Sequence, residues 1–309
     1  MPSEYAAPRA DGDWRADPET VAPTVLVVGG FLTAPPLYRR LARRLRRHGA
    51  ADVVVAPIWT PDWLLAATTG FGPIVRKAHR GLLRAARRSR ASPKSRGAPV
   101  LVIGHSAGGI VARILTATEP FAGRSYAAAE SIGAIVTLGS PHAVGRATLG
   151  RRLARLAAEF CERHVPGAFH APRVGYVAVA SRRIVGRVRG WPGRALFAYR
   201  VYQSLLPRPE AALIEGDGVV PLAAARLAGA REVVVDGAVH GHFGGGPWYG
   251  SEGVVDAWWP TAVEVWRAAL RARLADATAR GPGLRVEPDA GGAGRAADPA
   301  ARGTEAGGI

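Results

Sequence analysis

Six short runs of apolar, mostly β-branched residues recur along the chain, and they constrain its fold more than any other feature. Their apolar character is continuous rather than alternating, which is typical of strands covered by helices on both faces of a sheet. The runs are TVLVVG (24–29), DVVVAP (52–57), PVLVIG (99–104), IGAIVTLG (132–139), YVAVAS (176–181) and EVVVDG (232–237). Because the connections between them are long enough for crossover helices, the pattern predicts an α/β fold with a mostly parallel sheet.

Helical periodicity in these connections predicts six helices. They are expected at 36–48, 74–90, 107–118, 147–163, 194–206 and 251–275. The last one contains Trp258, Trp259 and Trp266, whose helical spacing favours packing on the core over a ligand platform.

The chain suits a single domain with two tails. Its 309 residues, 48% of them hydrophobic, can bury one large core, which we expect over residues 23–276. Residues 1–22 and 277–309 have no apolar periodicity and are expected to be disordered. No secretory signal or long apolar stretch is evident, so a cytoplasmic protein is expected. The single cysteine, Cys161, excludes an internal disulfide and a cysteine-based metal site.

The formal net charge of +17 comes almost entirely from arginine, with lysine only at Lys77 and Lys94. One arginine cluster shares a predicted helix with Leu37, Leu41 and Leu45, so the simplest interpretation is the solvated face of an amphipathic helix. The alternative is weak association with an anionic membrane surface, and no nucleic-acid partner is expected. The cluster consists of Arg39, Arg40, Arg43, Arg44, Arg46 and Arg47.

A candidate nucleophile follows the third apolar run. In Gly104-His105-Ser106-Ala107-Gly108-Gly109, a serine stands between a predicted strand and an apolar-periodic helix. A strained strand-to-helix turn exposes such a serine, and glycines two residues to either side allow the close approach of the backbone. The alternative is a glycine-rich turn whose serine caps a helix, but the context favours Ser106 as a nucleophile.

A serine nucleophile requires a histidine base and an acid that orients this base, and in strand–turn–helix hydrolases the acid and then the histidine follow in the chain. Asp217, in Gly-Asp-Gly-Val-Val-Pro, is the candidate acid, although Asp-Gly is also a common turn pair. His240 is the candidate base because it lies on the loop directly after the last apolar run, three residues after Gly237, with His242 as the alternative. Asp236 and Asp256 are rival acids.

Stabilisation of a developing oxyanion requires two backbone N–H donors. One is expected from Ala107, directly after the serine. The other is expected from Phe31, which follows Gly29 and Gly30 at the end of the first run, although these glycines could merely end a strand.

With these motifs the chain resembles the α/β-hydrolase superfamily, in particular a lipase-like branch that includes GPI inositol-deacylase-like proteins. Similar proteins carry the G-H-S-x-G-G elbow, a T-L-G-[ST]-P-H segment (here 137–142) and the G-D-G-V-V-P acid loop. The resemblance covers about residues 24–275 and makes His142 part of a structural signature. It implies helical cap insertions near 143–174 and 182–213. Lipases more often have His-Gly where this chain has Gly29-Gly30.

The function expected from these residues is hydrolysis of a small-molecule or lipid carboxylic ester through an acyl-enzyme, with no metal or organic cofactor. An acyltransferase on the same site and a non-catalytic protein that binds a lipid or a protein partner are the alternatives. A dinucleotide-dependent oxidoreductase is disfavoured because residues 25–35 lack G-x-G-x-x-G. The sequence does not indicate the oligomeric state.

Overall fold

The computed structural model describes residues 13–142, 149–188, 193–206, 212–242 and 244–279. Its centre is a six-stranded sheet in the order β2-β1-β3-β4-β5-β8, in which every neighbouring pair is parallel. The strands are β1 (Thr24–Val28), β2 (Asp52–Val55), β3 (Val100–His105), β4 (Ile132–Leu138), β5 (Gly175–Ser181) and β8 (Arg231–Val235). All six predicted runs therefore form strands of one parallel sheet, as expected.

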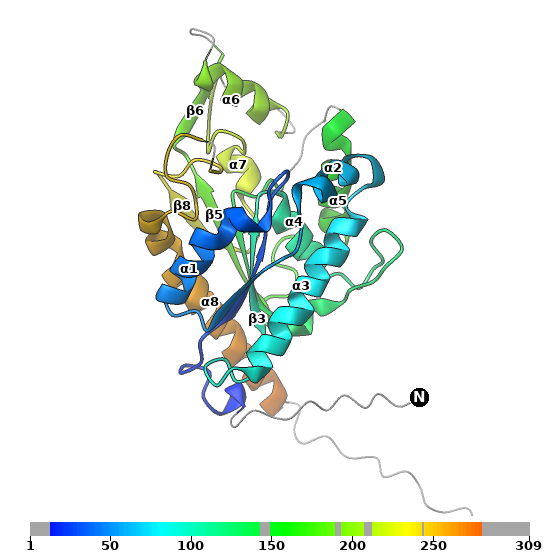
Figure 1. Cartoon of the computed structure of the whole chain (residues 1–309), viewed down its shortest axis with the longest axis vertical. Helices are drawn as coiled ribbons and strands as arrows, with labels where there is room; N and C mark the ends of the chain where they lie inside the picture. The colour runs from blue at the N-terminus through cyan, green and yellow to red at the C-terminus, as the bar shows by residue number, and fades with distance from the viewer. Residues whose placement is uncertain (1–12, 143–148, 189–192, 207–211, 243, 280–309) are drawn as a thin grey trace, which may run out of the picture.

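Helices cover both faces of this sheet, and this explains the continuous apolar runs. Leu26 and Val28 of β1 pack with one set of helices, whereas Val25 and Val27 pack with the other. The first set is α2 (Thr60–Thr69), α3 (Gly72–Ala91), α4 (Ala107–Ile114) and α5 (Leu149–His164). The second set is α1 (Arg39–Arg47) and α8 (Glu252–Ala279). Figure 1 shows α3 to the right of the sheet, with α1 and α8 to the left.

The tryptophans of α8 pack in the core, as their spacing predicts. Trp258 and Trp266 are fully buried, and the indole N–H of Trp266 donates to the carbonyl of Pro99 at 2.8 Å. This contact fixes α8 across the end of the sheet where β3 begins.

A smaller unit stands above the sheet (Figure 1). Strands β6 (Ile184–Arg187) and β7 (Leu213–Gly216) pair antiparallel, and α6 (Arg194–Gln203) packs on β6. Of this unit, β6 and α6 lie in the 182–213 segment that we expected to be a cap, whereas β7 begins at its last residue. By contrast, α5 packs on α4 and buries Ala157, Ala158 and Cys161 in the main core. Residues 143–148, 189–192 and 207–211 of the expected caps lie outside the described residues.

The prediction that the N-terminal segment is disordered is wrong for residues 13–22. A short 3-10 helix, η1 (Trp14–Ala16), buries Trp14, and Val21 is also buried in the core. The backbone N–H groups of Trp14 and Ala22 donate to the carbonyls of Arg96 and Lys94. Two well-spaced apolar side chains suffice to anchor the segment, although its average composition is polar. Residues 1–12 and 280–309 lie outside the described residues.

The remaining short elements are η2 (Pro35–Tyr38), η3 (Ala128–Ser131) and α7 (Leu222–Ala225). Neither α2 nor α7 was predicted from the sequence. The carboxyl ends of the parallel strands meet at one edge of the sheet, where ligands bind in open α/β sheets. The candidate site lies at this edge.

Candidate active site

Ser106 occupies the tight turn between β3 and α4. Its φ of 53° and ψ of −126° are strained for a residue with a side chain, and such strain is often found at functional sites. A Cβ on Gly104 would lie 2.4 Å from the Cα of Gly109, and one on Gly108 would lie 2.2 Å from the carbonyl oxygen of Val28. Backbone cannot give way at these distances, so both positions require glycine for the turn to form.

Three predicted site residues, far apart in sequence, form one hydrogen-bonded series. The Nε2 atom of His240 lies 2.9 Å from the Oγ of Ser106, and its Nδ1 lies 2.8 Å from an Oδ of Asp217. The backbone N–H of His240 also donates to the carbonyl of Asp217 at 2.9 Å. With Nδ1–H donating to the carboxylate, Nε2 is free to accept the serine proton.

Asp217 is almost completely buried, at 1% exposure, and all its partners donate to it. One carboxylate oxygen accepts from His240 and from the hydroxyl of Tyr249 (2.9 Å), and the other accepts from the N–H groups of Val219 (2.9 Å) and Val220 (2.7 Å). Burial alone would raise the pKa of Asp217, but the charge of His240 and these donors outweigh it, so the pKa lies below its usual value. The site therefore holds a carboxylate at neutral pH.

Tyr249 keeps its proton in this arrangement. Burial and the neighbouring Asp217 raise the pKa of its phenol well above the usual value, so the hydroxyl remains a donor to the carboxylate. The sequence motifs gave Tyr249 no role, because its contact with Asp217 spans 32 residues and depends on how the chain enters α8.

The two predicted oxyanion donors lie on either side of Ser106. A Cβ on Gly30 would approach the Cβ of Ser106 to 2.8 Å, so the loop that carries Phe31 passes directly beside the serine. The backbone N–H groups of Phe31 and Ala107 have no acceptor among the described residues. Both are therefore available to an oxygen atom bound at this point, and their role as an oxyanion hole stays a prediction.

A second hydrogen-bonded series, which the sequence did not predict, runs through the buried His105. Its Nε2 lies 2.7 Å from the carbonyl oxygen of His240, and its Nδ1 lies 2.8 Å from the hydroxyl of Tyr38. Because a carbonyl only accepts, Nε2 carries the proton and Nδ1 accepts from Tyr38, whose oxygen in turn accepts from the N–H of Gly30 at 2.9 Å. Burial lowers the pKa of His105 to about 3, which keeps the ring neutral. The series joins the loop of the candidate base to the loop beside the serine.

The alternative candidates lie elsewhere. His242 packs its ring on Trp248, with 4.1 Å between the ring centroids, and its buried Nε2 has no hydrogen-bond partner among the described residues. Asp236 is exposed and pairs with Arg182 at 2.5 Å, and Asp256 pairs with His48 at 3.1 Å. None of these rivals takes part in the series from Ser106 to Asp217.

His142 is buried in the segment after β4. Its ring nitrogens contact the side chains of Arg113 and Thr137, each at 3.2 Å. Burial, with a smaller effect of Arg113, lowers its pKa to about 3. It is not a partner of Ser106, which agrees with its place in a structural signature.

Across the described residues, no group of three or more His, Cys, Asp or Glu side chains could hold a metal ion. The same part of the chain contains no helix with the length and apolar character needed to span a bilayer.

The chain is similar to known proteins in sequence and in structure. A family profile described as a PGAP1-like alpha/beta domain matches residues 75–164. The mature form of a lipase from Bacillus licheniformis is 16% identical, with a TM-score of 0.51 over 86% of this chain and 96% of the lipase. A phospholipase from Legionella pneumophila is 15% identical, with a TM-score of 0.49 over 83% of this chain and 63% of the phospholipase. No curated protein sequence matches the chain. At such identities the likeness concerns the fold.

Proposed function

We propose that this chain, which has the α/β-hydrolase fold, is a serine hydrolase that cleaves carboxylic esters. The profile match and the likeness to a lipase fold agree with the family resemblance expected from the motifs, whereas the activity is our inference. One observation carries it: the unbroken series from Asp217 through His240 to Ser106, with donor–acceptor distances of 2.8 and 2.9 Å. A serine that merely caps a helix would need neither of these partners.

In the proposed acylation step, the Oγ of Ser106 attacks the carbonyl carbon of the ester while its proton passes to Nε2 of His240. The resulting oxyanion accepts from the N–H groups of Phe31 and Ala107. Collapse of this intermediate breaks the bond to the alcohol oxygen, which takes the proton from His240. Water then attacks the acyl-enzyme, again giving a proton to His240, and the acid leaves as the proton returns to Ser106.

The role of Asp217 follows from its charge. During both steps His240 becomes an imidazolium, and a carboxylate held at 2.8 Å from Nδ1 stabilises this cation and fixes its orientation. Because the lowered pKa of Asp217 keeps it ionised at neutral pH, this stabilisation is present at the pH where the enzyme would work.

Substitution of the serine tests the proposal most directly. Ser106→Ala should lower kcat/KM for p-nitrophenyl esters by about 10⁴-fold or more, because it removes the attacking atom. It should also abolish covalent labelling by a fluorophosphonate, which reacts with activated serines. Thermal unfolding should change little, since the substitution removes one oxygen atom from a half-buried side chain. Activity within tenfold of wild type would rule out Ser106 as the nucleophile.

A panel of p-nitrophenyl esters of increasing chain length would define the acyl preference, and added alcohols would reveal acyl transfer in place of hydrolysis. Absence of labelling and of turnover in the wild-type protein would favour the non-catalytic alternative.

A further inference from the structure

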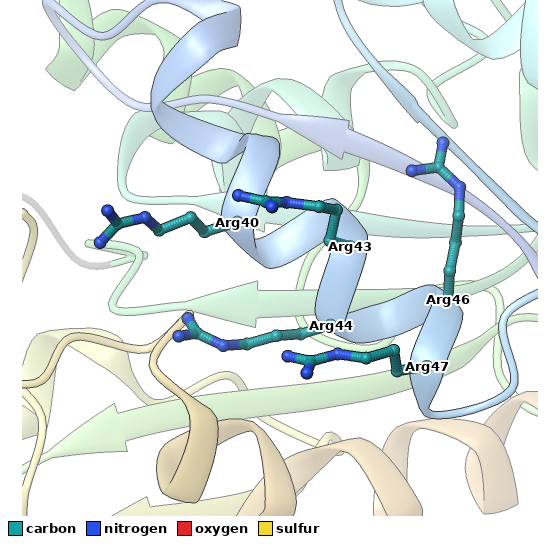
Figure 2. A pocket seen from close by; sticks show the side chains of 5 residues that line it. All are labelled: Arg40, Arg43, Arg44, Arg46 and Arg47. Atoms are coloured by element: carbon teal, nitrogen blue, oxygen red, sulfur yellow. The ribbon is translucent and has the colours of Figure 1, made fainter.

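Helix α1 concentrates positive charge at one place on the surface. Its nine residues include six arginines and no acidic residue, and only Leu41, Ala42 and Leu45 are buried. Five of the arginines line a hollow of about 550 Å³. They are Arg40, Arg43, Arg44, Arg46 and Arg47. Figure 2 shows that Arg40, Arg43, Arg44 and Arg47 extend from the helix side by side, whereas Arg46 points away from them.

Few carboxylates compensate this charge. Glu252 pairs with both Arg44 (4.0 Å) and Arg47 (3.5 Å). Asp52 pairs with both Arg46 and Arg88 of α3. Neither Arg40 nor Arg43 pairs with any carboxylate in the described parts of the chain. The unbalanced guanidinium groups repel one another, and an anion would relieve this repulsion. Their planar, forked N–H groups match the oxygens of a phosphate.

An exposed apolar rim lies beside the candidate active site. It consists of Phe31, Leu32, Trp59, Leu64 and Leu65, whose exposed fractions range from 43% for Leu32 to 59% for Leu64. Single exposed apolar side chains are common on protein surfaces, but five of them on two segments that contact each other form a patch, and apolar patches mark interaction sites.

The rim lies beside the serine, and α1 follows the rim loop in the chain. The ring of Phe31 packs edge-on against Trp63 of α2 at 5.8 Å, and the hydroxyl of Thr60 donates to the carbonyl of Leu32 at 3.3 Å. Gly30 adjoins Ser106, and α1 begins seven residues after Leu32. The arginines of α1 therefore follow directly on the segment that leaves the carboxyl end of β1 and carries Phe31 and Leu32.

We propose that α1 and the apolar rim form the surface through which this protein docks on an anionic lipid bilayer. The arginines of α1 bind the phosphate groups of the lipids, and the rim side chains enter the region of the acyl chains. This combination of basic and apolar groups is what binding at a charged bilayer surface requires. That the docked protein then presents Ser106 to the ester bond of a lipid rests on the proposed function.

Vesicle sedimentation separates docking from catalysis, since it can be done with Ser106→Ala protein. This protein should bind vesicles of phosphatidylcholine with 30% phosphatidylglycerol more tightly than pure phosphatidylcholine, and binding should weaken as salt is raised. The triple variant Arg40→Gln/Arg43→Gln/Arg47→Gln should bind the anionic vesicles roughly 100-fold more weakly, at about fivefold per arginine. Arg44 is left unchanged because it donates to the carbonyl of Gly250.

Helix α3 supplies the matched control. Arg80→Gln/Arg84→Gln/Arg87→Gln removes the same charge from exposed positions, and none of these three pairs with a described carboxylate. It should weaken binding by less than tenfold. An equal loss in both triple variants would mean that only the net charge matters, and it would overturn the assignment to α1. Binding of a single-stranded RNA that depends on the α1 arginines, with vesicle binding unaffected, would also overturn it.

The rim is tested in the same assay. Leu64→Ser/Leu65→Ser should lower binding to both kinds of vesicle by roughly tenfold or more, with little dependence on salt, because apolar burial is not screened. Leu83→Ser on α3, also an exposed leucine, is the control and should bind like the parent protein. Unchanged binding of the double variant would exclude the rim from the docking surface.

Catalysis is then measured with Ser106 restored. The α1 and rim variants should keep kcat/KM for a soluble short-chain ester within about twofold of wild type, and lose activity on lipid esters in anionic vesicles in proportion to their binding. If the wild-type protein binds vesicles but hydrolyses neither substrate, the proposed function fails while the docking surface stands. If it hydrolyses the soluble ester but binds no vesicles, the docking surface fails alone.

Discussion

Replacement of Asp217 by asparagine probes the site most sharply, because every partner of this carboxylate is a donor. The amide NH2 must face either His240 and Tyr249 or the N–H groups of Val219 and Val220. In the first orientation His240 must accept at Nδ1, which leaves Nε2 protonated and unable to take the serine proton. In the second, two buried N–H groups lose their acceptor, and the neutral amide no longer stabilises the imidazolium.

The size of the catalytic effect follows from the geometry. Opposite unit charges at the observed 2.8 Å attract by about 6 kcal/mol at an effective dielectric constant of about 20, an upper value because each charge is spread over its group. At about 1.4 kcal/mol per tenfold, this corresponds to roughly 10⁴-fold in kcat. Asp217→Asn should therefore lower kcat by about 10³- to 10⁴-fold. The free energy of unfolding should fall by about 2 kcal/mol for the donors that lose their acceptor.

Steady-state hydrolysis of a p-nitrophenyl ester measures this effect, with the rate of fluorophosphonate labelling as an independent readout of serine activation. Asp236→Asn is the control, because that carboxylate is exposed and its ion-pair partner among the described residues is Arg182. Its kcat/KM should stay within about twofold of wild type. The assignment would be refuted if Asp217→Asn retained kcat within tenfold of wild type, or if Asp236→Asn were the more damaging substitution.

The other predictions concern four histidines. His240→Ala should lower kcat/KM by about 10⁴-fold and His242→Ala by less than tenfold, and the opposite ranking would assign the base to His242. His105→Leu should lower kcat by about tenfold or more with little change in KM, because the carbonyl of His240 loses its donor. His105→Gln, whose amide can both donate and accept, should restore most of the lost kcat. An equal loss of kcat in both variants would contradict this reasoning. Because burial lowers the pKa values of His105 and His142 to about 3, the unfolded chain binds more protons between about pH 6.5 and pH 3. Denaturant titrations should show stability falling towards acid pH by up to about 1.4 kcal/mol per pH unit for each histidine, and a flat profile from pH 6.5 to pH 4.5 would argue against their burial as neutral rings.

The sheet could be predicted because each strand carries its own signal, whereas the smaller elements could not. Strands β1 and β3 are covered on both faces, so nearly every side chain in them is apolar. Helix α2 has little amphipathic character, since exposed Leu64 and Leu65 stand next to buried Trp63. Strands β6 and β7 are short and half exposed, and they become strands only by pairing with each other.

The same distinction applies to the candidate site. Ser106 and Asp217 each stand in a local pattern of glycines, and His240 lies on the loop after a strand. Such local patterns can be recognised in the sequence alone. His105 meets Tyr38 across 67 residues and His240 across 135. No local pattern encodes such contacts, because they arise only when β1, β3 and the loop after β8 are brought to one edge of the sheet.

The Gly29-Gly30 pair, where lipases more often have His-Gly, has a physical explanation in these contacts. A Cβ on Gly29 would lie 2.7 Å from the hydroxyl of Thr33 and 2.8 Å from the ring of Tyr38, so no larger side chain fits while that ring is in place. Tyr38 occupies this volume from η2, and its hydroxyl accepts from the N–H of Gly30 and donates to Nδ1 of His105. The loop beside Ser106 is thus held by its own Thr33, whose hydroxyl donates to the carbonyl of Gly30 at 2.6 Å, and by a tyrosine from the following element. The same tyrosine connects the loop through His105 to the backbone of His240. A movement of either loop must therefore break or carry with it the hydrogen bonds that hold the other.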